Sequence, residues 1–119
     1  MIRYEAVHNG NTTKVFAFDG ENAVGFGEIL CVLETADIID IEVSADYRRQ
    51  GIGREILNRL LDNAYLSGVK TITLEVRVSN VAARTLYENM KFIEISQRKR
   101  YYDDGEDAVI MQIKCLQCQ

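Results

Sequence analysis

The stretch "IIDIEVSADYRRQGIGREIL", residues 38–57, changes its character halfway along. It begins as an apolar run that is typical of a strand and ends with apolar residues at helical spacing, and three arginines surround two glycines near the junction. Backbone N–H groups at a helix start have no intrahelical acceptors, the helix dipole adds positive charge there, and glycine lets a ligand approach the main chain. The junction therefore predicts a phosphate site, although a tight turn with solvated arginines would show the same pattern.

The segments on either side of this junction predict a strand-helix-strand unit. From Gly51 the apolar residues recur with the period of a helix until Gly68, which is a typical C-terminal stop. The following segment "KTITLEVRV", residues 70–78, alternates strictly, so that its apolar and polar side chains lie on opposite faces. Two strands joined by a helix predict a parallel pair with a right-handed crossover.

The rest of the chain predicts antiparallel strands at both ends of this unit. Turn signals "NGN" and "DGEN" separate strands in the N-terminal third, and "DDG" joins the last two strands. A short helix at 81–90 is capped by Ser79 or Asn80. The strands are predicted at residues 1–9, 13–21, 23–34, 37–43, 70–78, 92–102 and 106–114. We therefore expect an α/β fold in a single domain, residues 1–119, with a central mixed sheet of about seven strands and two clear helices.

The composition limits what the protein can bind. A net charge of −4 argues against wholesale nucleic-acid binding. No apolar run approaches the about 20 residues that are needed to cross a bilayer, and the N-terminal segment lacks the apolar core of a signal peptide. We therefore expect a cytoplasmic protein with neither nucleic acid nor membrane as a partner.

The cysteines and the single histidine predict no metal site. Cys115 and Cys118 form a C-x-x-C pair that could bind metal or cycle between thiol and disulfide. A structural zinc site needs four ligands, and nothing nearby supplies the other two, so the pair is interpreted as a reduced tail. His8 lies in a predicted N-terminal strand, where a catalytic triad is not expected.

Three blocks of the chain occur in a characteristic order and spacing. They are "IEVSADYRRQGIGREIL" at 41–57, "TLEVRVSNVAARTLYENMKF" at 73–92 and "RYYDDGEDAVIM" at 100–111. Together they resemble the GNAT superfamily of N-acetyltransferases, and in particular the bacterial ribosomal-protein-alanine N-acetyltransferases and their relatives that acetylate protein N-terminal amines. The likeness covers residues 38–114 and implies the GNAT fold.

The resemblance implies acetyl-CoA as a co-substrate and no metal. In the family, a splayed strand pairs its backbone with the pantetheine arm, and the loop that follows it cradles the pyrophosphate. Asn80 matches a residue that hydrogen-bonds the cofactor arm, although it could merely cap the helix. The matching positions are Ile41, Glu42 and Val43 for the arm, and Arg48, Arg49, Gln50, Gly51, Ile52, Gly53 and Arg54 for the pyrophosphate.

By the same resemblance, Glu75 is the general base, acting through water, and Tyr87 is the general acid that protonates the coenzyme A thiolate. Each has a structural alternative, because Glu75 could be a solvent-facing carboxylate paired with Arg77 or a threonine, and Tyr87 could fill the core. Tyr101 and Tyr102 match a pair that lines the peptide groove, although tyrosines also favour strands. Adjacent strand residues point to opposite faces, so at most one of this pair fills the core.

One segment departs from the family. Relatives carry two helices between the first and second strands, and one helix forms a wall of the acceptor groove, whereas this chain has only "NGNT", residues 9–12. Such a link cannot hold a helix of ordinary length. Three outcomes stay open: an open site for bulky protein termini, a wall supplied by a second subunit, or a degraded acceptor site. Because the exposed sheet face would be apolar, we expect a homodimer.

The resemblance implies an acetyl-CoA-dependent N-acetyltransferase that transfers acetyl directly to an amine, with a protein N-terminal α-amine as the expected acceptor. An acetyltransferase of small-molecule amines is the enzymatic alternative. A non-catalytic acyl-CoA-binding module is the alternative from another class. The absence of the two helices favours the binding module, and the retained Glu75 and Tyr87 argue against it.

Overall fold

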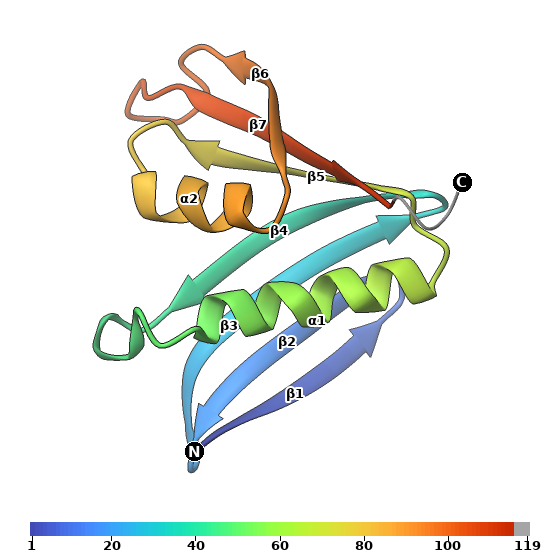
Figure 1. Cartoon of the computed structure of the whole chain (residues 1–119), viewed down its shortest axis with the longest axis vertical. Helices are drawn as coiled ribbons and strands as arrows, with labels where there is room; N and C mark the ends of the chain where they lie inside the picture. Colours follow the sequence, from blue (N-terminus) through green and yellow to red (C-terminus); the bar gives the residue numbers. More distant parts are fainter. Residues whose placement is uncertain (116–119) are drawn as a thin grey trace.

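The fold is built on one mixed sheet of seven strands (Figure 1). The computed structural model describes residues 1–115. The strands lie in the order β1-β2-β3-β4-β5-β7-β6, and only the neighbours β4 and β5 are parallel among the described strands. The predicted α/β fold with a seven-stranded mixed sheet and two α-helices is confirmed. The elements are β1 (Ile2–Asn9), β2 (Thr12–Asp19), β3 (Asn22–Val32), β4 (Thr35–Val43), the 3₁₀ turn η1 (Ala45–Tyr47), α1 (Ile52–Leu66), β5 (Thr71–Arg77), α2 (Val81–Asn89), β6 (Ile93–Arg98) and β7 (Ala108–Lys114).

The first four strands form the predicted antiparallel meander. Tight turns join them, and the first two turns use glycines in the left-handed region, Gly10 with φ of 61° and Gly20 with φ of 63°. Only Gly10 and Asn11 lie between β1 and β2. The chain therefore has no helix at this point, as its sequence predicts.

β4 and β5 run side by side over only three residue pairs. Residues 35–37 pair with residues 71–73, and beyond them the two strands diverge (Figure 1). The edge of β4 at residues 38–43 therefore has no strand partner on the side of β5. Unpaired N–H and C=O groups on a sheet edge are a template for another extended chain. The divergence creates an opening in which a ligand arm could pair with the sheet.

Both helices cover the same face of the sheet (Figure 1). α1 packs across β2, β3 and β4, and it comes close to β3 because a Cβ atom at Gly27 would lie 2.4 Å from Ile56 Cγ2. α2 contributes Tyr87, which packs beside Phe92 in the same core. The apolar stripe predicted for α1 is confirmed, with Ile52, Ile56, Leu57, Leu60, Leu61 and Ala64 all buried.

The opposite face of β1–β4 is covered by no helix of residues 1–115 (Figure 1). Phe16, Phe18 and Phe26 lie on this bare sheet face and are half-buried. The Phe16 ring centroid lies 6.2 Å from that of Phe18 and 5.3 Å from that of Phe26. The Arg3 guanidinium covers the Phe18 ring at 4.6 Å. An aromatic cluster is thus partly open to solvent at the place where an apolar patch is expected.

The last hairpin differs from the prediction. β6 ends at Arg98 and β7 begins at Ala108, so both strands are shorter than the sequence pattern indicates. Residues 99–107 form a loop in which a side chain replaces a backbone acceptor of the strand ladder. Asp107 Oδ1 accepts a hydrogen bond from the Arg100 N–H at 2.9 Å. Aspartate side chains compete with strand hydrogen bonds in this way, and strand periodicity does not reveal it.

Candidate active site

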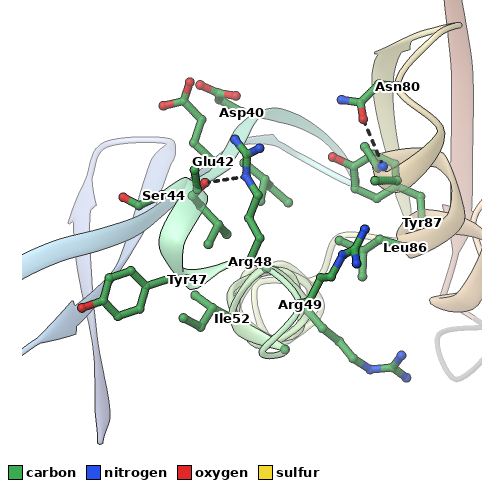
Figure 2. Close-up of a pocket in the computed structure, with 18 of the residues that line it drawn as sticks. Asp40, Glu42, Ser44, Tyr47, Arg48, Arg49, Ile52, Asn80, Leu86 and Tyr87 are labelled. Atoms are coloured by element: carbon green, nitrogen blue, oxygen red, sulfur yellow. Dashed lines mark hydrogen bonds between the residues drawn. The ribbon is translucent and has the colours of Figure 1, made fainter.

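A cavity of 1120 Å³ opens where β4 and β5 diverge (Figure 2). It is lined by the end of β4, the loop after it, the first turn of α1 and part of α2. These segments are far apart in sequence, and the fold brings them to one place. The predicted site residues that line the cavity are Ile41, Glu42, Val43, Arg48, Arg49, Gly51, Ile52, Gly53, Arg54, Asn80 and Tyr87.

The loop between β4 and α1 has a backbone conformation that few residues adopt. Arg49 has a φ of 63°, and Gly51, directly before the first helical residue, has a φ of 81°. A left-handed arginine costs free energy and is typical of functional sites. Gly51 supplies no side-chain cap, so the first N–H groups of α1 stay available to a ligand. The Gln50 side chain instead donates to the Asp46 carbonyl at 3.4 Å and does not line the cavity.

Positive charge gathers at the same end of the cavity. Arg48, Arg49 and Arg54 all line it. Arg48 donates from Nε to the Val43 carbonyl at 3.1 Å, which ties the loop to the end of β4 (Figure 2). Arginine side chains beside a helix N-terminus are a suitable environment for a phosphate group.

Gly53 leaves free space in this part of the cavity. A Cβ atom at this position would lie 3.6 Å from Val43 Cγ2 and 3.7 Å from Leu86 Cδ2, which are ordinary contacts. The packing of the protein itself therefore does not require glycine here, in contrast to Gly27 under α1. The absence of a side chain at Gly53 is better explained by room for a ligand next to the main chain.

Tyr87 lies on the other side of the opening, on α2 (Figure 2). Its side chain is 8% exposed, and its ring centroid is 5.9 Å from that of Phe92, so it also contributes to the core. Burial, followed by the charges of Asp40 and Tyr102, raises the pKa of Tyr87 to about 12. A phenol with this pKa keeps its proton at neutral pH, as a general acid must.

Asn80 performs the capping role that the sequence allows. Its Oδ1 accepts from the Ala83 N–H at 3.2 Å at the start of α2. Of the two candidates for this cap, Asn80 rather than Ser79 is the N-cap residue. Asn80 also lines the cavity, so its predicted contact with a cofactor arm stays a prediction that its position allows.

Glu75, Tyr101 and Tyr102 do not line the cavity, but they lie beside it. Glu75 is exposed on β5. Tyr101 lies close to Glu75, and the interaction of its hydroxyl with the Glu75 carboxylate raises the pKa of Tyr101. The Tyr102 ring meets the Tyr101 ring edge-on at 5.0 Å and lies 4.1 Å from the guanidinium of Arg77, which does line the cavity. The predicted base and the predicted groove tyrosines therefore form one cluster.

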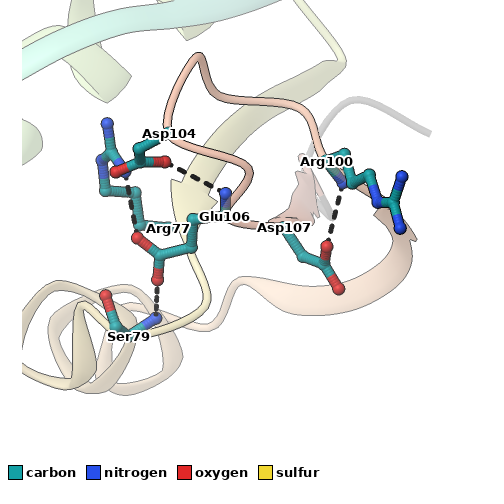
Figure 3. Close-up of polar contacts among 6 residues, drawn as sticks. All are labelled: Arg77, Ser79, Arg100, Asp104, Glu106 and Asp107. Atoms are coloured by element: carbon teal, nitrogen blue, oxygen red, sulfur yellow. Dashed lines mark hydrogen bonds and ion pairs between the residues drawn. The ribbon is translucent and has the colours of Figure 1, made fainter.

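Arg77, at the end of β5, contacts acidic side chains of the loop at residues 99–107 (Figure 3). Its Nη1 donates to Asp104 Oδ2 at 2.8 Å and to Glu106 Oε1 at 3.0 Å. The other oxygen of Glu106 accepts from the Ser79 N–H at 2.8 Å. Hydrogen bonds from Ser79 and Arg77 hold the pKa of Glu106 below its ordinary value. Arg77 is therefore engaged by the loop and is not the partner of Glu75 that the structural alternative assigned.

Sequence reasoning missed several residues of the cavity. Asp40, Ser44 and Tyr47 line it, and the Tyr47 hydroxyl donates to Asp19 Oδ2 at 2.6 Å, which anchors the loop to the end of β2. Asp40 could have been found, because it lies two positions before Glu42 and alternation places the two on one strand face. The Tyr47–Asp19 pair has no local signal, since 28 positions separate the two residues.

Comparison with known proteins assigns the family. Residues 2–92 match the acetyltransferase (GNAT) family. The chain belongs to this family. The ribosomal protein bS18-alanine N-acetyltransferase of Escherichia coli strain K12 is 47% identical to this GNAT chain over 85 residues, which are 69% of this chain and 57% of that protein. The match thus spans less than two thirds of that relative's length.

Solved structures agree on the fold of this GNAT chain. The crystal structure of the ribosomal-protein-S18-alanine N-acetyltransferase from Escherichia coli has a TM-score of 0.87 and 30% identity, over 96% of this chain and 94% of that one. A chain of the NatC complex bound to Gag peptide and CoA has a TM-score of 0.81 and 26% identity, over 86% of this chain and 70% of that one. The predicted GNAT fold is therefore confirmed.

Other features bear on what the described part of the GNAT chain could bind. Within residues 1–115, no group of three or more His, Cys, Asp or Glu side chains is placed to hold a metal ion. No helix in that range has the length and apolar character needed to cross a membrane. Cys31 and Cys115 carry free thiols. Cys118 lies outside the described residues, so the interpretation of the C-x-x-C pair stays a prediction.

Proposed function

We propose that this GNAT chain is an acetyl-CoA-dependent N-acetyltransferase that transfers acetyl directly to a protein N-terminal α-amine. The observation that carries the proposal is the position of Tyr87, a buried and protonated phenol on the same cavity as the arginine and glycine loop. A phosphate site alone would suit many ligands. A phosphate site and a proton donor across one opening, in a chain of this family, suit a thioester of coenzyme A.

The cofactor side of the cavity fits acetyl-CoA, which would supply the acetyl group as a thioester. Residues 41–43 would pair with the pantetheine arm along the edge of β4 that lacks a strand partner. Arg49, Arg54 and the N–H groups that follow Gly51 would bind the pyrophosphate. The free space at Gly53 supports this fit, because a side chain there would narrow the passage between Val43 and Leu86.

The chemistry needs two proton transfers, which two side chains of the site could perform. Acetyl transfer forms a bond between the amine nitrogen and the acetyl carbon and breaks the bond between that carbon and sulfur. One proton must leave the attacking amine, and one must reach the departing sulfur. Glu75 is proposed to accept the first through water, with Tyr101 beside its carboxylate. Tyr87 is proposed to donate the second, because burial keeps it protonated beside the opening.

A protein N-terminus is the favoured acceptor. Tyr101 and Tyr102 lie on a loop next to Glu75, where their side chains could contact the backbone of a peptide. Two of the similar proteins support this class, since one is a ribosomal protein bS18-alanine N-acetyltransferase and the other is a NatC complex bound to a peptide. The short turn between β1 and β2 holds no helix that would restrict the size of the acceptor.

We also propose a homodimer and a cytoplasmic location. The partly exposed cluster of Phe16, Phe18 and Phe26 supports association, because a monomer rarely exposes a large apolar patch. The location rests on the relatives named for ribosomal protein bS18, whose substrate is a component of the ribosome.

The test follows thiol release from acetyl-CoA with a panel of N-terminal peptides and small amines, using wild type and Tyr87→Phe. We expect turnover with peptides and a loss of kcat of about 100-fold or more in the variant, which is the usual contribution of a general acid. Tyr4→Phe is the matched control, because burial also raises the pKa of Tyr4 but this residue lies on β1 away from the cavity.

The outcomes distinguish the three candidate functions. Turnover of small amines alone would support the enzymatic alternative. Tight binding of acetyl-CoA with no turnover on any amine would support the binding module. An unchanged kcat in Tyr87→Phe would remove the role of Tyr87 while leaving the enzyme in place.

A further inference from the structure

We propose that Arg77 is a positioning residue, which holds the loop at residues 99–107 against β5 and thereby orients Tyr101 and Glu75 for the acceptor. The inference rests on the proposed function for what these two residues do. It goes further by assigning a role to a residue that would contact neither acceptor nor reacting atoms.

The first step of the argument is the set of groups that share one guanidinium. The Nη1 of Arg77 donates to Asp104 at 2.8 Å and to Glu106 at 3.0 Å, and its Cζ lies 4.1 Å from the centre of the Tyr102 ring. All three partners belong to the loop, whereas Arg77 ends β5. One side chain of the sheet therefore contacts the loop at three points, of which Figure 3 shows the two carboxylates.

The second step leads from these contacts back to Glu75. The Tyr102 ring, held against Arg77, packs edge-on against the Tyr101 ring at 5.0 Å. Tyr101 in turn lies close enough to Glu75 for this carboxylate to raise the pKa of the Tyr101 hydroxyl. Glu75 and Arg77 lie two positions apart on the same face of β5. The contacts thus lead from Arg77 through Tyr102 to Tyr101, which lies beside Glu75 on the same strand.

The third step explains why an arginine is required. A guanidinium is planar, so it can donate to carboxylates at its edge while its face lies on an aromatic ring. A lysine ammonium is a compact point charge that could keep an ion pair but not the stacked contact with Tyr102. Lysine at position 77 should therefore retain only part of the order of the loop.

The fourth step separates positioning from folding. The Arg77 side chain is 41% exposed, and Asp104 is 60% exposed, so the network lies outside the hydrophobic core. The loop has a second attachment that does not involve the guanidinium, since the Val78 N–H donates to the Asp107 carbonyl at 3.1 Å. We therefore expect Arg77 variants to fold, with the loop loosened.

The test measures the loop and the reaction separately, in wild type, Arg77→Met and Arg77→Lys. Hydrogen exchange without any ligand reports the loop, through the Tyr102 N–H that donates to the Glu106 carbonyl and the Gly105 N–H that donates to the Tyr102 carbonyl. Steady-state kinetics with acetyl-CoA and an N-terminal peptide report the reaction. Arg59→Met is the matched control, because Arg59 also combines an ion pair, with Glu55 at 2.8 Å, and a ring contact, with Tyr4 at 4.6 Å, on α1 away from the loop.

In Arg77→Met we expect exchange of these two amides to rise about tenfold or more. We expect the peptide kcat/KM to fall about 10- to 100-fold, as for a small misplacement of reacting groups, with the KM for acetyl-CoA within about threefold of wild type. The exchange rates and kinetic constants of Arg77→Lys should lie between those of wild type and Arg77→Met, and Arg59→Met should match wild type.

Unchanged exchange in Arg77→Met would overturn the proposal. So would a parallel rise of the KM for acetyl-CoA, because it would make Arg77 a cofactor ligand in the cavity. If wild type turns over no amine, the proposed function fails, while the exchange data still decide whether Arg77 holds the loop.

Discussion

Tyr87 combines two roles that are usually separate, because it packs in the core and faces the opening between β4 and β5. Burial is the main reason for both roles. Exclusion from solvent fixes the ring in the core, and it also raises the pKa of the hydroxyl from 10.0 to about 12. A structural tyrosine and a general acid are therefore not competing interpretations of this residue. Burial would keep the Tyr87 hydroxyl protonated and thus able to act as the acid.

The raised pKa predicts a pH profile without an alkaline loss from Tyr87. A tyrosine of ordinary pKa would be half-ionised at pH 10, whereas Tyr87 would be ionised to only about one per cent there. The protonated form therefore persists as the pH rises, and kcat should stay level between pH 8 and 10. The measurement is kcat against pH with saturating acetyl-CoA and peptide, corrected for spontaneous thioester hydrolysis and paired with circular dichroism. A decline centred near pH 10 in a protein that is still folded would contradict the argument.

At this scale, the sequence indicates site residues where the spacing is local and misses them where it is not. Asn80 could be predicted as a cap because its acceptor bond reaches only to Ala83. The partners of Arg77 could not be predicted, since Asp104 and Glu106 lie 27 and 29 positions further along and meet it only after the loop has folded. Residues this far apart in the sequence could be assigned to one site only through the resemblance to the family.

Among the elements, α1 shows two glycine contacts with different causes. Gly27 lies under the helix, where a methyl group would overlap Ile56, whereas Gly53 lies in the first turn of the helix itself and would meet only ordinary contacts. One glycine allows the helix to approach the sheet. The other leaves space beside the cavity.

This difference predicts opposite results for two alanine variants. Gly53→Ala should keep or slightly raise the melting temperature, because alanine favours helix, and should weaken acetyl-CoA binding about tenfold by narrowing the cavity. Gly27→Ala should lower the free energy of unfolding by about 1–3 kcal/mol through overpacking and leave the affinity of the folded protein nearly unchanged. Thermal melts and calorimetric titration with coenzyme A measure both. A Gly53→Ala protein that binds as tightly as wild type would show that the space is not used by the ligand.

The elements themselves are the part of the fold that the sequence predicts best. The alternation in β5 and the apolar stripe of α1 are local patterns, and both appear where expected. The ends of β6 and β7 could not be predicted from local patterns. Asp107 Oδ1 accepts a hydrogen bond from the Arg100 N–H, and the strand ladder ends early for this reason. The separation of β4 from β5 also has no local signal and entered only through the resemblance.

At the scale of the whole molecule, both helices of residues 1–115 lie on one side of the sheet, and the bare sheet face has no element of that range packed on it (Figure 1). Phe16 and Phe26 form a cross-strand pair near the middle of this face. Its half-buried rings would be covered in a dimer and exposed in a monomer. The aromatic cluster on the bare sheet face is therefore the surface through which we expect the homodimer to form.

Sedimentation velocity at micromolar concentration checks this hypothesis, and we expect a dimer for the wild type. Phe16→Glu should give a monomer, because a carboxylate in the middle of the contact would be costly to bury. Leu33→Glu should remain dimeric, since Leu33 is 89% exposed in the turn between β3 and β4 rather than in the aromatic cluster. A wild-type monomer, or a Phe16→Glu protein that still dimerises, would rule out this contact.

Three residue pairs between β4 and β5 join two parts of the sheet. One part is β1–β4 with α1 packed on it, and the other is β5–β7 with α2 (Figure 1). The angle between these two parts sets the width of the opening, so that width does not depend on the length of the turn between β1 and β2. A chain built in this way can lose or gain segments at its margins, as at the turn between β1 and β2, without changing the gap at its centre.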